Sequence, residues 1–314
     1  MNRKNIIIHP EELTDSMVEL IIKSGVETLG IHPVGGRDSL ESMKRLMEQV
    51  HNSQYCGRVQ KLRDNGVKIE YQLHALSYLL PRELFSEHPE WFRIDENGNR
   101  NNDMNMCATN AKALEYITES TAKVVSELKS DTGRYYFWLD DVSGGGCGCE
   151  NCKHLTLSDQ AMLIYNAILK GVRKVDPNGK QCFLAYIKQL NPPEKVKPDE
   201  GIFVEFAPMR GNTNKTFADN PENEKFTMHI KPLLDTFGKK DSTVLDYWLD
   251  NSLFSNWTKP PKKLEINPDV IASDVVFYKS CGFEEITTFA CYLSDDYREL
   301  HGEPPIAEYI KITN

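Results

Sequence analysis

The stretch Tyr135-Tyr136-Phe137-Trp138-Leu139-Asp140-Asp141 joins an aromatic run to two neighbouring aspartates. Aromatic side chains favour β-strands, whereas aspartate and glycine favour turns and loops. Glycines follow almost at once, at positions 144, 145, 146 and 148. The stretch therefore predicts a buried strand whose carboxyl end carries two carboxylates and leads into a loop.

The alternation of strand-like and helix-like sequence recurs along the whole chain. Strand-like runs are expected at residues 5–8, 28–32, 67–73, 135–140, 181–186, 202–206, 243–248 and 285–290. Helical patterns lie between them at residues 13–24, 39–65, 226–237 and 268–280, and after caps predicted at Asn110 and Ser158. Eight such units predict a (β/α)₈ TIM barrel, with a single domain at 1–314. A doubly wound open sheet is the alternative, but the sequence has no Gly-x-Gly-x-x-Gly turn.

The connection after the third expected strand is long. It contains Asn97-Gly98, a pair typical of a type I′ hairpin turn. In a barrel, the loops that follow strand carboxyl ends build the active-site face. We therefore expect a hairpin-bearing insertion at residues 75–110 that helps to line a substrate cleft.

Charge and hydropathy limit the partners. The chain has 37 Lys and Arg against 46 Asp and Glu, a formal net charge of −9, which argues against nucleic acid or an anionic membrane as the partner. No apolar run approaches the ~20 residues of a membrane span. The apolar run at residues 6–8 is too short for a signal peptide. We expect a cytoplasmic protein, or a periplasmic or secreted one whose leader has been removed.

Asp140 and Asp141 are the candidate catalytic residues, because barrel strands end at the catalytic face. Ordinary glycosidases place two carboxylates on either side of the scissile bond, about 5–5.5 Å or 6.5–9.5 Å apart. Adjacent residues at one strand end are badly placed for that, and instead favour a reaction in which the substrate's own 2-acetamido group attacks the anomeric carbon. The structural alternative is a helix cap or a solvated turn.

The segment Phe137-Trp138-Leu139-Asp140-Asp141 resembles the strand-four Asp-Asp motif of family 84 β-N-acetylglucosaminidases, and is similar in role to the Asp-Glu pair of family 20 hexosaminidases. The resemblance to family 84 implies that Asp140 orients the acetamido group and that Asp141 is the general acid. The cysteine-rich loop that follows is a departure from that family.

A wider set of motifs resembles a family of glycoside-hydrolase-like barrels known as a domain of unknown function. These motifs are Pro81-Arg82-Glu83-Leu84-Phe85 with His88-Pro89-Glu90-Trp91-Phe92, Met106-Cys107-Ala108-Thr109-Asn110, and the aspartate followed by Cys147-x-Cys149-x-x-Cys152. The resemblance covers residues 60–155 by motif and the remainder by architecture. It implies a glycosidase-type barrel.

Three cysteines lie within six residues in Cys147-x-Cys149-x-x-Cys152. Structural Zn²⁺ takes four Cys or His ligands, and Cys107 in the preceding long loop is the first candidate for the fourth, with His154 the second. A structural zinc site is therefore expected, and no organic cofactor. A disulfide that includes Cys107, or free thiols, are the alternatives.

Polar and aromatic residues at other expected strand ends are candidates for substrate binding. They are His74, Tyr186, Arg210, Asp246, Trp248, Asp250, Asn251 and Tyr292. Each has a structural alternative, such as a core position for Trp248 or a surface charge for Arg210.

The sequence thus predicts a glycoside hydrolase acting on a carbohydrate or glycoconjugate, with N-acetylhexosaminide hydrolysis as its specific form. A sugar-binding barrel without catalysis is the alternative. A zinc-dependent hydrolase is disfavoured because four thiolates leave no open position for water.

Overall fold

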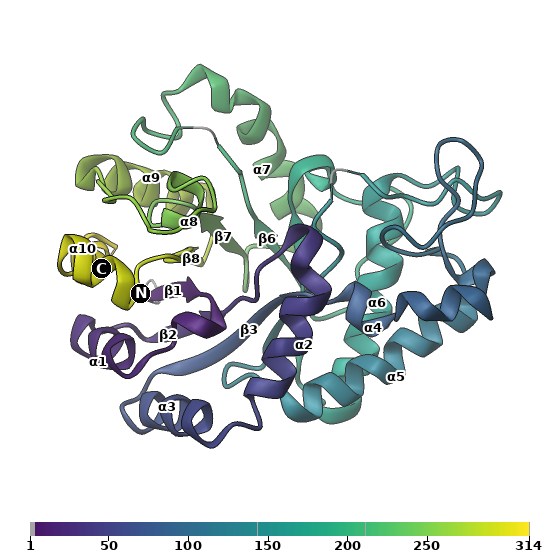
Figure 1. Cartoon of the computed structure of the whole chain (residues 1–314). Helices are drawn as coiled ribbons and strands as arrows, with labels where there is room; N and C mark the ends of the chain where they lie inside the picture. Colours follow the sequence, from purple (N-terminus) through teal and green to yellow (C-terminus); the bar gives the residue numbers. More distant parts are fainter. Residues whose placement is uncertain (1–3, 143, 211, 314) are drawn as a thin grey trace. The chain divides into compact units, whose positions relative to one another are not determined.

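A computed structural model describes residues 4–142, 144–210 and 212–313 of the chain. Within these residues, the strands are β1 (Asn5–Ile8), β2 (Thr28–Ile31), β3 (Lys68–His74), β4 (Arg134–Trp138), β5 (Lys180–Ala185), β6 (Ile202–Phe206), β7 (Thr243–Asp246) and β8 (Glu285–Thr288). They follow one another in the sheet in the order β1 to β8. Figure 1 shows two of these neighbours, β7 and β8, side by side. Beside the contact of β8 with β1, the Ala290 N–H donates to the Ile7 carbonyl at 2.7 Å. The predicted fold, a (β/α)₈ barrel, is confirmed.

The eight strands match the eight strand-like runs, and β1 and β6 match them residue for residue. In six strands every residue is buried, and in β3 and β5 only end residues are not. Parallel strands are covered by helices on one face and by the barrel interior on the other, so both faces lose water. This is why the strands read as apolar and aromatic runs rather than as strict alternation.

The chain divides into two compact units. The first comprises Met1–His32, His51–Glu70 and Glu205–Asn314. Its helices are α1 (Asp15–Ser24), α3 (Ser53–Asp64), α7 (Glu224–Phe237), α8 (Asn251–Phe254), α9 (Pro268–Cys281), α10 (Asp295–His301) and α11 (Ile306–Ile312). In this unit α11 contacts both α1 and α9, so the last helix of the chain packs against one of the first.

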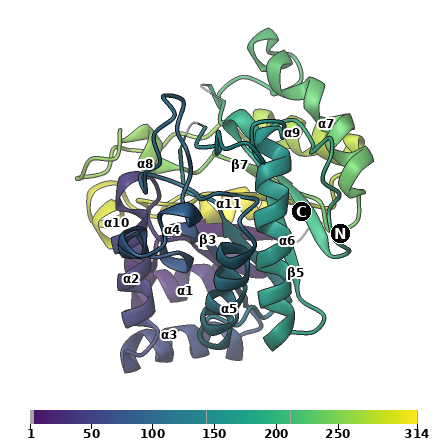
Figure 2. The same cartoon turned by 90° about the vertical axis from the view of Figure 1, so that its right-hand side faces the viewer.

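The second unit comprises Pro33–Val50 and Tyr71–Val204. Its helices are α2 (Ser39–Gln49), α4 (Leu76–Leu79), α5 (Ala111–Glu127) and α6 (Leu157–Val175). The two long helices α5 and α6 lie side by side (Figure 2). Gly171 permits this close approach, because a Cβ at that position would lie 2.4 Å from the Thr118 carbonyl oxygen of α5.

Two helix predictions are wrong, and capping explains both. The single helix expected at 39–65 is two helices, α2 and α3, because the Asn52 side chain accepts hydrogen bonds from the Gln54 and Tyr55 N–H groups and starts a new helix. Helix α6 is capped by Thr156 rather than Ser158, whose hydroxyl instead donates to the Asn191 carbonyl at 2.6 Å. The predicted cap at Asn110 is confirmed.

The expected small hairpin is present, but its turn differs from the prediction. Ile94 and Arg100 pair in antiparallel fashion, and the Gly98 N–H donates to the Asp95 carbonyl at 3.1 Å. Of Asn97 and Gly98, only Gly98 has a positive φ, of 82°. A type I′ turn needs positive φ at both positions, so the type I′ prediction is wrong.

No helix among the described residues is long and apolar enough to cross a membrane.

Candidate functional site

Both oxygens of the Asp140 carboxylate accept hydrogen bonds from donors of the second unit. One oxygen accepts from the Ser77 N–H at 3.1 Å, and the other from the Asn105 N–H at 2.6 Å and from the Arg82 guanidinium. The Asp140 N–H in turn donates to the Asn105 side-chain oxygen at 3.1 Å. Arg82 is fixed by a second bond, to the Asn105 carbonyl at 2.7 Å. Asp140 therefore ties the end of β4 to the segments that follow β3.

Asp141 is the next residue, but its carboxylate takes no part in the hydrogen bonds that Asp140 makes. Among the residues that the structure describes, its carboxylate has no hydrogen bond or ion pair. A Cβ placed on Gly35 would lie 2.9 Å from an Asp141 carboxylate oxygen and 3.1 Å from the His74 ring, so Gly35, His74 and Asp141 meet at one place. Of the two adjacent carboxylates, that of Asp141 is therefore the one without a partner among the described residues.

Two side chains at neighbouring strand ends border Asp141. His74, at the end of β3, lies against Trp138 with ring centroids 5.0 Å apart, and its Nδ1 is 2.7 Å from the Leu139 carbonyl. A carbonyl accepts only, so Nδ1 carries the proton in this contact. Tyr186 follows β5, and burial raises the pKa of its phenol, with the Asp141 charge adding to the effect. Tyr186 is therefore a neutral hydrogen-bond donor at neutral pH.

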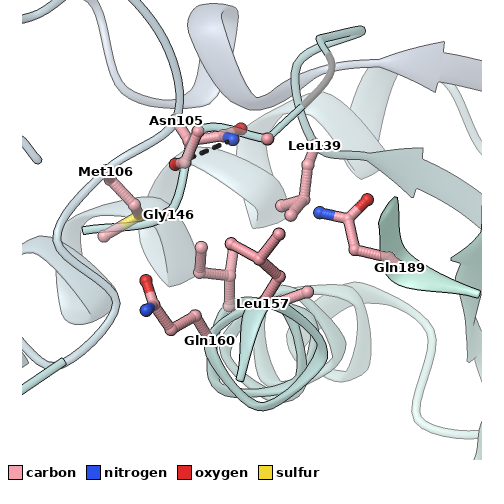
Figure 3. A pocket seen from close by; sticks show the side chains of 11 residues that line it. Asn105, Met106, Leu139, Gly146, Leu157, Gln160 and Gln189 are labelled. Carbon is pink, nitrogen blue, oxygen red and sulfur yellow. Dashed lines mark hydrogen bonds between the residues drawn. The ribbon is translucent and has the colours of Figure 1, made fainter. Parts of the chain in front are cut away.

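The glycine loop after Asp141 is seated on the start of α6. Gly144 and Gly145 have φ values of 117° and 81°, which other residues rarely adopt. The Asn105 side-chain amide donates to the Gly145 carbonyl at 3.2 Å (Figure 3). A cavity of about 10 Å³ lies there, bordered by Leu139, Leu157 and Gln160. It has room for about one water molecule and is too small for a sugar.

The four cysteines predicted to bind zinc gather in one place, and we call them the cysteine cluster. Their sulfur atoms all lie within 4.8 Å of one another; the residues are Cys107, Cys147, Cys149 and Cys152. The Cys107 sulfur is 3.7 Å from that of Cys149 and 3.9 Å from that of Cys152. None of the four forms a disulfide in the structure. His154, the second candidate for a fourth ligand, is exposed and outside the cluster.

Gln160 of α6 fixes the cysteine loop. Its side-chain oxygen accepts from the Cys147 N–H at 2.7 Å, and its amide nitrogen donates to the Cys147 and Cys152 carbonyls at 3.3 and 3.2 Å. Neither the aspartate motif nor the cysteine motif reveals Gln160, because its contribution depends on how α6 packs. Asn105 was missed for the same reason.

Three predicted substrate-binding residues lie in a buried charge network of the first unit. The Arg210 guanidinium is 2.6 Å from Asp274 and 3.3 Å from Asp246, and the charged side chains have no exposed surface. The Trp248 ring N–H donates to Asp274 at 3.2 Å, and the Tyr278 hydroxyl donates to Asp246 at 2.8 Å. Arg210, Asp246 and Trp248 are thus buried and bound to other protein groups, and their substrate-binding roles stay predictions.

Sequence patterns did not identify Asp274 and Tyr278 as members of this network. A signal was available in α9, where Asp274 lies next to Val275 on the buried side of the helix. An aspartate on a buried helix face requires a partner, because an isolated buried charge is very costly. Burial raises the pKa of Asp246, and the Arg210 charge opposes that shift.

The other predicted binding residues of the first unit have structural contacts as well. Asp250 caps α8 by accepting from the Ser252 and Leu253 N–H groups at 3.1 and 3.2 Å. The Asn251 amide donates to the Lys262 carbonyl at 2.9 Å. Tyr292 is half-buried, and its backbone has an unusual positive φ of 61°. The substrate-binding roles of these three residues stay predictions.

One further group of donor atoms went unnoticed in the sequence. His9, Glu12 and Cys291 of the first unit bring a nitrogen, an oxygen and a sulfur within 4.8 Å of one another. The Glu12 oxygens accept from the His9 N–H at 3.0 Å and from the Tyr292 N–H. Burial raises the pKa of Glu12 to about 7. These hydrogen bonds join Glu12 to the backbone at His9 and Tyr292 within the first unit.

Comparisons with known proteins agree with the fold. Residues 39–235 match a family described as "Domain of unknown function (DUF4838)". No curated protein matches the sequence.

Several solved structures share the fold. An endo-β-mannanase/endo-β-glucanase from Prevotella bryantii aligns at 11% identity and a TM-score of 0.52, over 96% of this chain but only 43% of that one. A glycoside hydrolase family 5 enzyme from Prevotella bryantii B14, solved with a xyloglucan tetradecasaccharide, aligns at 13% identity and 0.53, over 96% and 87%. A broad-specificity endoglucanase from Bacteroides salanitronis gives 10% and 0.53, over 96% and 84%. Identities this low show the fold alone, and the resemblance to family 84 and family 20 is not confirmed.

Proposed function

Because this chain belongs to the family described as Domain of unknown function (DUF4838) and has a fold found in carbohydrate-degrading enzymes, we propose that it is a glycoside hydrolase. The observation that carries the proposal is the contrast between the two adjacent aspartates that follow β4. Asp140 is saturated with protein donors, whereas Asp141 has none among the described residues. A carboxylate at the end of a barrel strand, with no partner among the residues that the structure describes, is a candidate catalytic group.

In the proposed reaction Asp141 is the general acid that protonates the leaving oxygen. His74 and Tyr186 border it and can hold the substrate by hydrogen bonds. Asp140 acts on Asp141 through the backbone, since its bonds to Ser77, Arg82 and Asn105 fix the strand end. Asp140 is therefore a positioning residue, and its occupied oxygens make it a poor partner for a substrate amide.

N-acetylhexosaminides are the specific substrate class that we propose to assay first. A substrate-assisted reaction takes its nucleophile from the substrate's acetamido group, so one proton-transferring carboxylate is sufficient. Asp141, which follows β4, is such a carboxylate. The substrate would be a free oligosaccharide or a glycoconjugate.

The test is a panel of aryl glycosides, with N-acetylhexosaminides and plain hexosides, assayed with the full chain and with Asp141→Asn. Loss of a general acid costs about 10²–10⁴ in rate. The loss should be largest for glycosides with poor leaving groups and small for dinitrophenyl glycosides, which need no protonation. Asp199→Asn, an exposed carboxylate of the same unit, is the control and should keep the parent rate.

An Asp141→Asn variant with the parent rate on every cleaved glycoside would remove Asp141 from the mechanism. Silence across the panel, together with oligosaccharide binding measured by calorimetry, would favour the non-catalytic glycan-binding barrel instead. Silence without any binding would overturn both proposals.

A further inference from the structure

We propose that the cysteine cluster binds one Zn²⁺ ion, and that this ion holds the segments that carry and clamp the β4 aspartates. The cluster joins two loops that are far apart in sequence. Cys107 closes the long insertion after β3, and the other three sulfurs come from the loop after β4. The site is structural, so the proposal is independent of whether the chain cleaves a sugar.

The sulfur positions fit tetrahedral zinc. Four Zn–S bonds of about 2.3 Å in a regular tetrahedron put neighbouring sulfurs about 3.8 Å apart. The Cys107 sulfur is 3.7 Å from that of Cys149 and 3.9 Å from that of Cys152, and every pair is within 4.8 Å. A disulfide would require about 2.05 Å. The four sulfurs are therefore spaced as the ligands of one tetrahedral ion rather than as a bonded pair.

The surroundings also suit bound thiolates. The Ile94 N–H donates to the Cys147 sulfur at 3.4 Å, and the Thr109 hydroxyl is 3.2 Å from the Cys152 sulfur. Hydrogen bonds of this kind orient metal ligands and tune their charge. Cys107 and Cys149 also border an open depression of about 650 Å³, which gives an ion a route from solvent.

The cluster is linked to the aspartates through a few backbone bonds. Asn105, two residues before Cys107, donates its N–H to Asp140 at 2.6 Å and its side-chain amide to Gly145 at 3.2 Å. Gly145 is two residues before Cys147. In each loop, a proposed zinc ligand therefore lies two residues from a residue that takes part in the hydrogen bonds around Asp140. A metal ion that fixes both loops would also fix these hydrogen bonds.

The site is closed to catalysis. Four thiolates complete the tetrahedron and leave no position for a water molecule. Four sulfur ligands also suit iron, so elemental analysis has to identify the metal.

The first experiment measures metal in the full chain purified without added chelator. We expect about one zinc per chain by mass spectrometry. Cobalt added to the stripped protein should give the intense absorption bands of tetrahedral thiolate ligation. Cys149→Ser should weaken zinc binding by more than the ~10–100-fold caused by loss of an outer hydrogen bond. Cys56→Ser, a change at an exposed cysteine outside the cluster, is the matched control and should leave one zinc.

A cysteine variant that fails to fold would give no information on zinc binding, so a second test uses the parent chain alone. Titration of its thiols with a mercurial should release zinc in proportion to the thiols modified. A parent chain with less than a tenth of an equivalent of zinc, and no cobalt bands, would overturn the site. A full equivalent of iron would overturn the choice of zinc.

The link to the aspartates has its own readout in hydrogen exchange. Metal removal should raise exchange at the Asn105 and Val142 amides, whose partners are Asp140 atoms. Amides of α9 in the first unit should keep their protection. Unchanged exchange at Asn105 and Val142 after zinc loss would overturn the positioning role. A chain that binds zinc but cleaves no glycoside would contradict the proposed function and support the metal site.

Discussion

Two places in this molecule bring an arginine to a pair of aspartates, and they use the carboxylates differently. In the first unit Arg210 lies between Asp246 and Asp274, and none of the three side chains is exposed. In the second unit Arg82 binds only the first of the two aspartates, Asp140, and Asp141 remains without a partner among the described residues. The first arrangement closes on itself, whereas the second leaves one carboxylate for something outside the protein. The protein partners that a strand-end carboxylate already has therefore separate the structural carboxylates from the candidate catalytic one.

The largest expected effect on stability tests the closed arrangement. Asp274→Ala leaves the Arg210 charge buried with one carboxylate fewer and removes the acceptor of the Trp248 N–H. Loss of one partner from a buried ion pair costs about 3–5 kcal/mol. Urea unfolding should show that loss, whereas Asp269→Ala, exposed on the same helix, should cost less than ~1 kcal/mol. Equal stability of the two variants would contradict the structural role of the network.

A somewhat smaller effect on stability is expected at Glu12, a buried carboxylate that is not paired with an arginine in the described residues. Burial raises the pKa of Glu12 from 4.5 to about 7, so between those pH values the folded chain holds a proton that the unfolded chain releases. The contribution of Glu12 to the free energy of unfolding is therefore complete below pH 4.5. It falls by about 3 kcal/mol as the pH rises to about 7. Glu12→Gln should remove that slope in unfolding experiments across this pH range. A slope that persists unchanged in the variant would assign it to other groups.

The smallest effect distinguishes the two neighbouring aspartates by stability alone. Asp140→Asn disturbs an acceptor of two backbone N–H groups and of Arg82, which should cost about 1–3 kcal/mol. Asp141→Asn breaks no described bond and should change the free energy of unfolding by less than ~0.5 kcal/mol. Thermal and urea unfolding of both variants give the comparison. A reversed order would mean that Asp141 is the structural residue.

Much of the barrel was predictable because its signals are local. Each β-strand is a short apolar or aromatic run, and each parallel strand needs a helix before the next one. Helix ends were less predictable, since Thr156 and Ser158 are both good caps and only packing decides that Thr156 is used. The break at Asn52 was missed because its neighbours continue a helical pattern.

The candidate site was predictable in part for a different reason. Asp140 and Asp141 are marked by their place after an aromatic strand, and the cysteines by their close spacing. Arg210, Asp246 and Trp248 carry equally good signals at strand ends, yet they face one another in a buried network. Sequence position shows that a polar residue follows a strand, but not whether another residue has already satisfied it.

The amino-acid sequence by itself determined the strands, the barrel class, the Asp140-Asp141 pair and the four cysteines, because each depends on residue type and spacing along the chain. Tertiary structure alone decided that Asn105 and Arg82 hold Asp140, that Asp141 is left over, and that Cys107 joins the other three sulfurs. These contacts join residues 35 to 58 positions apart, and their geometry depends on how whole loops pack against α6 and the strand ends.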